Sequence, residues 1–246
     1  VESAKQSLTN FLGLLNLRGK RFLDLGCGSG LFSLAAYELR ASRVVSIDID
    51  EDAIACTQQL RGAQHRPTNW IIKKGSALDQ RFLSRLGSFD IVYSWGVLHH
   101  TGDMYQAIEN ATTLVKPGGK LYIAIYNENK TNLLHGTSAF WLRVKKKYNQ
   151  SGMATKKLFY YLYAGYLLLG LLATGHNPGK YIQNYRSNRG MNWRHDIVDW
   201  LGGYPYEFAP PNKIINFLKK RNFLCTKLVR SHTIGNNEYL FERGTS

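Results

Sequence analysis

Leu23-Asp24-Leu25-Gly26-Cys27-Gly28-Ser29-Gly30, residues 23–30, is the stretch that decides the fold of this 246-residue chain. An apolar run at 21–25 leads into three glycines, and a helical apolar pattern at 31–40 follows them. Glycine lets the backbone turn sharply and lets a ligand approach it closely. The free amides at the start of the next helix can bind an anionic group. The stretch therefore predicts a strand, a ligand-binding turn and a helix.

The alternation of strand and helix continues along the chain. Strands are predicted at 21–25, 43–49, 70–74, 89–94 and 121–126, and helices at 3–17, 31–40, 51–60, 104–115 and 211–221. Two further strands at 226–232 and 238–241 flank a turn at 235–237 and form a hairpin. This order predicts an α/β fold: a doubly wound, Rossmann-like, seven-stranded sheet, mostly parallel, with a C-terminal antiparallel hairpin and a helical insertion after the fifth strand.

Asp48 is the expected acidic partner of the glycine turn. It ends the second predicted strand, 22 residues after Gly26, where a doubly wound sheet presents a carboxylate to the ribose of a bound nucleoside. The dinucleotide fingerprint places two residues between its last two glycines, whereas only Ser29 separates Gly28 from Gly30. The spacing therefore argues against NAD, and Asp48 indicates another nucleoside cofactor.

Five stretches, in this order, resemble the class I S-adenosylmethionine (SAM) dependent methyltransferases, with a core like methyltransferase types 11 and 12. They are LDLGCGSG at 23–30, VVSIDIDEDAI at 44–54, GSALD at 75–79, FDIVYSWGVLHH at 89–100 and LVKPGGKLYIAIYNE at 114–128. Together they cover about half of the chain, and the core is also similar to quinone-pathway methyltransferases. The resemblance implies a SAM-dependent transferase with SAM as cofactor.

The resemblance also implies a set of cofactor-binding residues. Asp24 and the turn at 26–30 would hold the methionine end of SAM, Asp48 the ribose, and Ser76 the adenine; many relatives carry Asp where Ser76 stands, so this contact is weaker here. The backbone after the fourth strand would line the site near the sulfonium. The full set is Asp24, Gly26, Cys27, Gly28, Gly30, Asp48, Ile49, Ser76, Ala77, Ser94 and Trp95.

Transfer to an alcohol or phenol needs a general base, and histidine suits this role because its pKa lies near neutrality. His99 and His100 follow the fourth strand, and Tyr126, Asn127 and Glu128 end the fifth. The first choice is His195, in the aromatic-rich stretch 189–207, with Asp196 or Asp199 as its orienting partner. On a helix, His195 and Asp199 share a face. The same residues could instead form a polar network that pins the insertion to the core. No metal-ligand spacing stands out.

Charge is concentrated in the insertion. The whole chain carries +15, yet the stretch 129–189 holds ten basic residues and no Asp or Glu, which leaves +5 (22 − 17) for the rest. An acid-free, aromatic-rich segment favours an anionic partner such as a phosphate, a nucleic acid or a membrane surface. A solvated basic face is the alternative.

Residues 158–179 contain no charged side chain. Four tyrosines and three glycines interrupt the apolar run, and a span here would separate the C-terminal strands from their sheet, so a membrane-spanning helix is not expected. The preferred interpretation is a helical lid that excludes water from the reaction, or a homodimer contact. A membrane-surface contact through 156–175, with Lys156 and Lys157 on anionic lipid, is the alternative.

The expected organisation is a SAM-binding Rossmann-like core at 1–128, a basic helical lid at 129–189, and an acceptor-site wall with the last strands at 190–246. Three cysteines are too few for a disulfide framework and indicate a reducing compartment. No signal peptide is visible, which favours a cytoplasmic protein, peripheral at the membrane if the surface contact exists. The chain begins with Val1, so a longer parent chain is allowed.

The leading hypothesis is methyl transfer from SAM to a small-molecule or lipid-linked acceptor, anionic or phosphate-bearing, at a sugar or quinone-like hydroxyl. RNA is the alternative acceptor, because basic and aromatic residues together suit nucleic acid. A non-catalytic SAM-binding partner subunit is the third hypothesis. It predicts cofactor binding without turnover.

Overall fold

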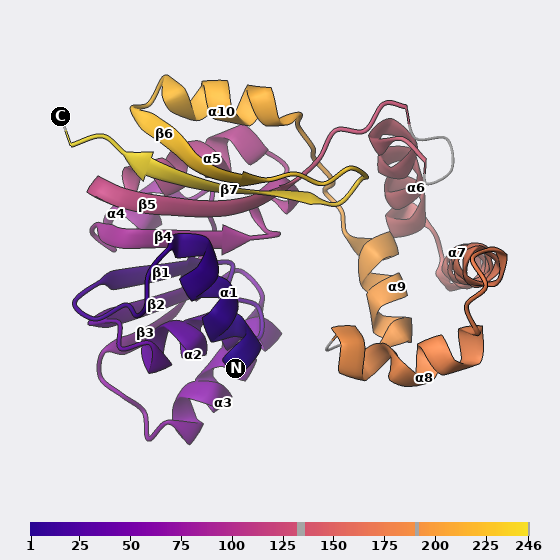
Figure 1. Ribbon diagram of the computed structural model, residues 1–246, viewed down its shortest axis with the longest axis horizontal. Coiled ribbons are helices and arrows are strands. Elements are labelled where there is room, and N and C mark those ends of the chain that lie inside the picture. The colour runs from indigo at the N-terminus through magenta and orange to yellow at the C-terminus, as the bar shows by residue number, and fades with distance from the viewer. Residues whose placement is uncertain (132–135, 190–191, 246) are drawn as a thin grey trace. The chain divides into compact units, whose positions relative to one another are not determined.

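Seven strands form one sheet in the order β3-β2-β1-β4-β5-β7-β6 (Figure 1). The computed structural model describes residues 1–131, 136–189 and 192–245. The strands are β1 (Arg21–Leu25), β2 (Arg43–Asp48), β3 (Trp70–Lys74), β4 (Phe89–Trp95), β5 (Val115–Tyr126), β6 (Phe223–Val229) and β7 (Asn236–Arg243). The first five run parallel, and β7 is antiparallel to both β5 and β6. The predicted fold class, including the C-terminal hairpin, is confirmed.

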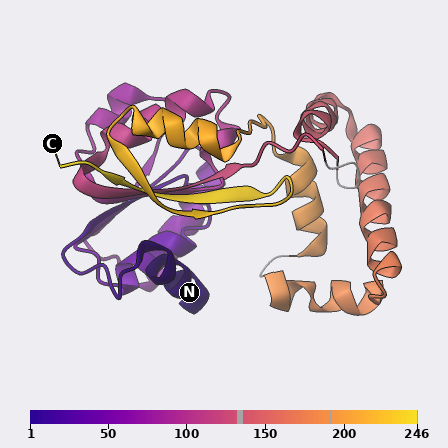
Figure 2. The ribbon, with the colours of Figure 1, turned by 45° about the horizontal axis from the view of Figure 1, so that its top comes forward.

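Helices cover both faces of this sheet (Figure 2). Those packed with it are α1 (Glu2–Leu12), α2 (Leu31–Glu38), α3 (Glu51–Ala63), α4 (Gln80–Ser84), α5 (Met104–Thr113) and α10 (Pro211–Lys219), with a short 3₁₀ turn η1 (Leu98–His100). Apolar residues of α1 and α2 form one buried cluster with β1 and β2, and those of α5 and α10 form another with β4 and β5. The two clusters hold the strands from opposite sides, so the loops at the strand ends have a rigid base.

The first helix is shorter than its apolar spacing predicts. It ends at Leu12, because Gly13 takes a left-handed conformation with φ of 66°. Leu15, which belongs to the apolar spacing of the helix predicted at 3–17, is 94% exposed, while Leu17 is buried. The helical periodicity of 3–17 therefore fails at its C-terminal end.

The structure divides the chain into two compact units. The core unit comprises Val1–His135 and Glu207–Ser246, and the helical unit comprises Gly136–Tyr206. The helical unit contains α6 (Ser138–Gln150), α7 (Met153–Ala173), α8 (Pro178–Arg189) and α9 (Trp193–Gly202). Since α9 packs with α6 and α7, this division does not coincide with the boundary expected at residue 189. Of the stretch 189–207, Gly190 and Met191 lie outside the described residues, as does Ser246 at the end of the chain.

Aromatic rings fill the interior of the helical unit. The ring of Trp141 lies 5.2 Å from that of Tyr163 and 5.3 Å from that of Trp200, which joins α6, α7 and α9. The ring of Tyr148 lies 6.1 Å from that of Phe159. These aromatic residues therefore pack α6, α7 and α9 against one another.

Candidate cofactor and active site

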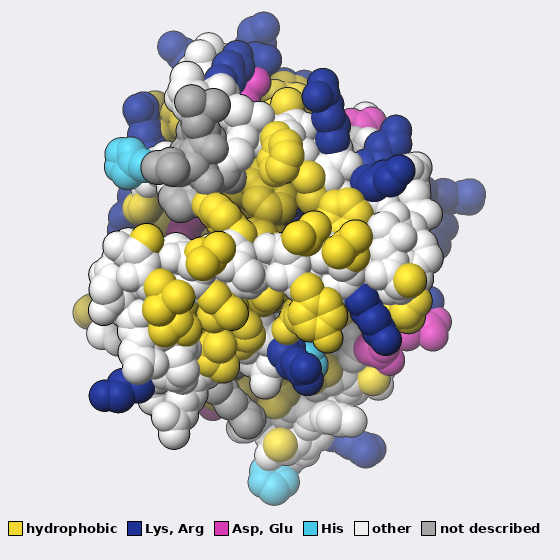
Figure 3. Space-filling model, turned by 90° about the vertical axis from the view of Figure 1, so that its right-hand side faces the viewer, with side chains coloured by type: hydrophobic (Ala, Val, Ile, Leu, Met, Phe, Trp, Pro, Cys, Tyr) yellow, Lys and Arg dark blue, Asp and Glu magenta, His cyan; other side chains and the backbone are white. Residues whose placement is uncertain are grey.

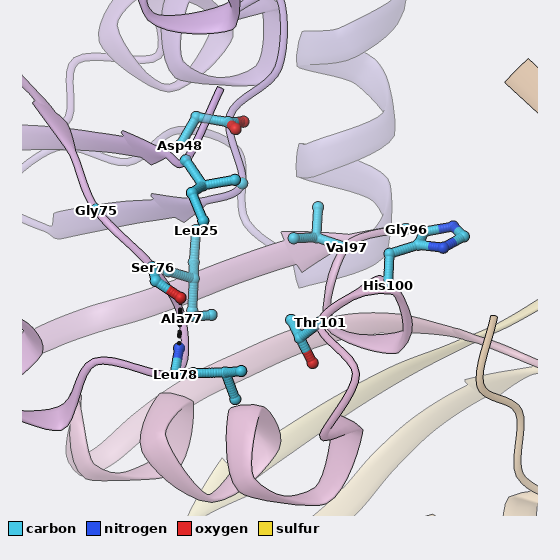
Figure 4. A pocket seen from close by; sticks show the side chains of 12 residues that line it. Leu25, Asp48, Gly75, Ser76, Ala77, Leu78, Gly96, Val97, His100 and Thr101 are labelled. Carbon is cyan, nitrogen blue, oxygen red and sulfur yellow. Dashed lines mark hydrogen bonds between the residues drawn. The ribbon is translucent and has the colours of Figure 1, made fainter. Parts of the chain in front are cut away.

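A cavity of about 380 Å³ opens in the core unit where β1, β2 and β4 end (Figure 4). The carboxyl ends of parallel strands are where open α/β sheets bind their ligands. Its walls come from the loops that follow four strands. The lining residues are Leu25, Gly26, Asp48, Ile49, Gly75, Ser76, Ala77, Leu78, Gly96, Val97, His100 and Thr101.

The glycine turn approaches the loop after β4 too closely for a side chain. Gly26 has φ of +85°, and a Cβ added to it would lie 2.4 Å from both methyl groups of Val97. Gly30 has φ of +79°, and its Cβ would lie 2.6 Å from the Thr57 hydroxyl. Gly30 also precedes α2 without a side-chain cap, so the first amides of that helix are available to a ligand. The turn is shaped for close approach to a polar or anionic group.

Two backbone amides orient the Asp48 carboxylate. Its Oδ2 accepts a hydrogen bond from the Gly28 amide at 2.8 Å, and its Oδ1 accepts one from the Asp50 amide at 3.0 Å. A carboxylate has about four acceptor sites, so each oxygen keeps capacity for a further donor. Asp48 lies on the cavity wall (Figure 4), where a pair of ribose hydroxyls could donate to both oxygens.

Asp24 lies beneath the turn and does not line the cavity. It is buried, and its Oδ2 accepts a hydrogen bond from the Ser33 hydroxyl at 2.6 Å. The Ser46 hydroxyl donates to Ser33 at 2.6 Å, and the Trp70 indole donates to Ser46 at 2.8 Å. Burial raises the pKa of Asp24 from 3.8 to about 7, more than the Ser33 hydrogen bond lowers it. This relay links β1, α2, β2 and β3 below the turn.

The loop after β3 forms the wall facing Asp48. The Ser76 hydroxyl accepts a hydrogen bond from the Leu78 amide at 3.1 Å (Figure 4). The Asn110 side chain on α5 donates to the Ala77 carbonyl at 2.8 Å. The Ser76 hydroxyl keeps its own proton for an acceptor in the cavity. These contacts fix the loop that the resemblance places against adenine.

The structure brings five of the eleven expected cofactor residues to the cavity wall: Gly26, Asp48, Ile49, Ser76 and Ala77. The other six do not line it. Ser94 is buried and donates its hydroxyl to the Leu25 carbonyl at 2.7 Å, which ties β4 to β1. Trp95 is 43% exposed and therefore is not a core aromatic. Six lining residues were not among those expected: Leu25, Gly75, Leu78, Gly96, Val97 and Thr101.

The two adjacent histidines have different surroundings. His99 is fully buried, with its ring centre 4.0 Å from that of Tyr126, and its Nδ1 accepts a hydrogen bond from the Tyr126 amide at 3.3 Å. His100 lines the cavity, although its ring points away from Asp48 and Ser76 (Figure 4). That ring lies 4.5 Å from the ring of His99. The structure thus places His99 in the packing around η1 and leaves His100 as the histidine with access to a ligand.

The end of β5 borders a second, open depression in the core unit, of about 600 Å³. Asn127 and Glu128 line it, and Glu128 pairs with Lys130 at 3.5 Å. Lys213 and His232 also line it. The polar side chains of Asn127 and Glu128, which follow the fifth strand, therefore lie beside cationic groups.

The predicted trio on α9 is not joined by hydrogen bonds. His195 and Asp199 are exposed on the same helix, and no hydrogen bond or ion pair connects His195 to Asp196 or Asp199. Asp196 instead accepts a hydrogen bond from the Tyr185 hydroxyl of α8. The trio lies in the helical unit, and its role as general base stays a prediction.

Glu207, where the chain re-enters the core unit, has a role that the sequence did not single out. Its carboxylate accepts hydrogen bonds from the amides of Gly102, at 3.1 Å, and Met104, at 3.0 Å. Its own amide donates to the His99 carbonyl at 3.0 Å. Glu207 thus holds the start of α5 and the turn that carries His100. Among the described residues, no group of three or more His, Cys, Asp or Glu could hold a metal ion.

Comparison with known proteins agrees with this geometry. A family model described as a methyltransferase domain matches residues 16–165. The chain is 33% identical over 117 residues to a ubiquinone biosynthesis O-methyltransferase of Azotobacter vinelandii, covering 47% of this chain and 48% of that protein. It is 32% identical over 116 residues to the protein of that name from Coxiella burnetii, covering 47% of each. The chain spans about half the length of these curated relatives.

Solved structures share the fold at low identity. A SAM-dependent methyltransferase from Mesorhizobium loti superposes with a TM-score of 0.55 at 16% identity, with 98% of each chain covered. Magnesium protoporphyrin IX methyltransferase from Synechocystis, with bound S-adenosylhomocysteine (SAH), superposes with a TM-score of 0.58 at 14% identity, covering 99% of this chain and 83% of that one. The structural likeness extends over nearly the whole chain.

The chain belongs to the methyltransferase domain family, within the class I SAM-dependent methyltransferases. SAM is the cofactor of this class, and the cavity fits it. The turn at Gly26 permits close approach, α2 offers free amides to the methionine carboxylate, and Asp48 keeps acceptor capacity for the ribose.

Proposed function

We propose that this chain transfers the methyl group of SAM to a hydroxyl of a small-molecule or lipid-linked acceptor. The observation that carries the proposal is the cavity at the ends of β1, β2 and β4, with Asp48 on one wall and His100 on another. When bound, SAM supplies an electrophilic methyl group on a sulfonium. The chain must then bind the acceptor with its oxygen in line with that methyl and remove the proton of the hydroxyl.

His100 is the residue on the cavity wall that can take this proton. A neutral imidazole accepts a proton through whichever ring nitrogen is unprotonated, and a positioned base contributes roughly 10²–10⁴-fold to rate. Glu207 positions the turn that carries His100, because its amide donates to the His99 carbonyl and its carboxylate accepts from the Gly102 amide. His195, exposed on α9, is the second candidate for the base.

The acceptor class is inferred from the charge of the helical unit and from the relatives. Residues 136–206 carry ten basic and two acidic side chains, a net of +8 (10 − 2), which favours an anionic or phosphate-bearing acceptor. The matching curated relatives are named for O-methylation in ubiquinone biosynthesis. A quinone-like or sugar hydroxyl is therefore the proposed site of transfer.

The test is transfer of labelled methyl from SAM into a native extract that is then separated into lipid, polar metabolite, RNA and protein. The proposal predicts label in the lipid or polar metabolite fraction. Label in RNA would instead favour the nucleic-acid acceptor that the +8 charge also suits. SAM binding without label in any fraction would favour a non-catalytic partner subunit.

A further inference from the structure

The helix α7 exposes a row of large apolar side chains, most of them leucines. Leu158, Leu162, Leu169 and Leu172 are each between 57% and 68% exposed, and Tyr161 between them is 65% exposed. Their spacing of three, four or seven residues places them on one face of the helix. A surface helix of a globular protein normally buries such a stripe, so this exposed stripe calls for a partner.

The opposite face of α7 already has its packing partners. Phe159 and Tyr163 lie against the rings of Tyr148 and Trp141 on α6. Burial among these groups raises the pKa of the Tyr163 hydroxyl. The exposed leucines are therefore not the face through which α7 packs into the helical unit. The helix has two apolar faces, and the helical unit covers one of them.

Four exposed lysines belong to α7 and to the helices that precede and follow it in the chain. Lys146 and Lys147 end α6, Lys157 lies in the first turns of α7, and Lys180 begins α8. No carboxylate of the described residues forms an ion pair with any of these four. Figure 3 shows the result: hydrophobic side chains gather in a band, and lysine and arginine side chains border it. The surface offers an apolar strip within a basic margin.

We propose that the exposed face of α7 binds the surface of an anionic lipid bilayer, with the helix axis parallel to the membrane. The leucine face, defined as Leu158, Tyr161, Leu162, Leu169 and Leu172, enters the boundary between headgroups and acyl chains. The lysines reach the anionic headgroups, and each contributes favourably when it lies near such a surface.

The charge argues for lipid over a second copy of the chain. A two-fold contact places the same patch opposite itself, so the uncompensated lysines of both copies would face each other. The chemistry argues against nucleic acid on this face, because bases stack on aromatic rings and four of its five apolar residues are leucines. An anionic bilayer accepts both the leucines and the lysines.

A surface contact also agrees with the length and composition of the helices. Among the residues described, no single helix is long and apolar enough to cross a membrane. By length and composition alone, α7 and the segment Pro178–Tyr185 pass that test together, but they are bent by 117° at their junction. The proposal goes beyond the transfer reaction and does not depend on it, because binding to lipid needs neither SAM nor an acceptor.

The test is co-sedimentation with vesicles of phosphatidylcholine alone and of phosphatidylcholine with phosphatidylglycerol, without SAM. The wild-type chain is expected to bind the anionic vesicles. A variant with Leu162→Glu and Leu169→Glu should lose roughly tenfold or more of that affinity. The matched control is Leu224→Glu on β6, which makes the same change at a leucine that is 70% exposed and should bind like wild type.

The basic margin is tested separately with Lys146→Gln and Lys147→Gln together. This pair should lose roughly tenfold or more in affinity for the anionic vesicles, while Lys219→Gln and Lys220→Gln, an exposed pair on the core unit, should change it little. Near-ultraviolet circular dichroism shows whether each variant keeps the wild-type fold; if the double glutamate variant does not, Leu169→Gln replaces it, with Leu224→Gln as its control.

Three results would overturn the proposal. The first is no binding of the wild-type chain to anionic vesicles. The second is equal loss in the α7 variants and their core-unit controls, which would indicate a general charge or stability effect. The third is a wild-type chain that does not bind vesicles but is a dimer in sedimentation equilibrium, while the double glutamate variant is a monomer. That result would show that the leucine face binds a second copy of the chain. Failure to find methyl transfer leaves all three readouts unaffected.

Discussion

The Ser33 hydroxyl donates a hydrogen bond of 2.6 Å to the Asp24 carboxyl, and Asp24 is buried directly below the glycine turn. This contact joins the residue before the turn to the helix after it. Because burial holds the pKa of Asp24 at about 7, the folded chain keeps a proton there that the unfolded chain has lost above its ordinary pKa of 3.8. The turn therefore rests on a group that titrates near neutrality.

Asp24 should make the cofactor-free chain less stable as pH rises from about 4 to about 7. In that window the folded state binds more protons than the unfolded state, so the free energy of unfolding falls with pH, by at most about 4 kcal/mol. Asp24→Asn keeps an acceptor for Ser33 without the titration. Urea unfolding of both proteins across this window measures the difference, and a wild-type minus variant difference that does not change with pH would contradict the prediction.

Gly26→Ala should disrupt the turn, because its Cβ would lie 2.4 Å from Val97 and its φ is +85°. The expected result is a loss of stability of several kcal/mol, or of SAM binding, or of both. Adding Val97→Ala should restore part of the loss by removing the clash while the φ strain remains. Gly62→Ala in α3, with no atom within 4 Å of its Cβ, is the control and should stabilise by about 0.5–1 kcal/mol. Thermal melts and calorimetry with SAM measure both quantities.

Lys145 should have the opposite pH dependence to Asp24. It is fully buried in the helical unit, with its ammonium 3.8 Å from the centre of the Trp200 ring, and burial lowers its pKa from 10.5 to about 7. Between these two values the folded state binds fewer protons than the unfolded state, so stability rises with pH, by at most about 5 kcal/mol. Lys145→Met should remove this rise. Urea unfolding, monitored by tryptophan fluorescence, measures the free energy of unfolding of both proteins across this pH range. An equal rise of that free energy with pH in Lys145→Met and in wild type would contradict the prediction.

His100→Ala should lower the transfer rate by roughly 10²-fold or more if His100 is the general base, with SAM affinity changed much less. His195→Ala tests the alternative base in the same assay. His99→Ala should instead lower stability, because it leaves a cavity beside Tyr126. The pH profile of kcat/KM distinguishes a general base from a structural residue. A base must be unprotonated to act, so kcat/KM falls at low pH, and only a variant that lacks the base should lose this fall.

Local sequence patterns predicted the sheet well where apolar runs end at turns. The strands at 21–25 and 70–74 match β1 and β3 residue for residue. The pattern placed the start of β5 at Leu121, whereas the strand begins at Val115. Residues 116–119 interrupt the pairing inside β5, because the register against β4 passes from Val115 directly to Lys120 and Gly118 has φ of +70°. The strand begins earlier than the apolar pattern indicates because Val115 pairs with Phe89, a contact that has no local signal in the sequence.

The sequence predicted the residues of the cofactor site only where they belong to a short motif with a fixed spacing. The turn and Asp48 follow from their spacing, but the contact of Gly26 with Val97 joins two loops 71 residues apart (97 − 26) and has no local signal. Sequence could not choose between His99 and His100, because adjacent residues in a 3₁₀ turn point in different directions. On α9 the spacing placed His195 and Asp199 on one face, but Asp196 bonds to Tyr185 on another helix.

SAM affinity of Asp48→Ala tests the central claim most directly. Asp48 is the residue that joins the glycine turn, through the Gly28 amide at 2.8 Å, to the cavity wall. Calorimetric titration with SAM should show affinity lower by roughly tenfold to a hundredfold, as expected for hydrogen bonds to a charged group. Asp52→Ala, the same change at an exposed residue of α3 outside the cavity, should bind like wild type. Equal affinity in wild type and Asp48→Ala would contradict the assignment of this cavity to SAM.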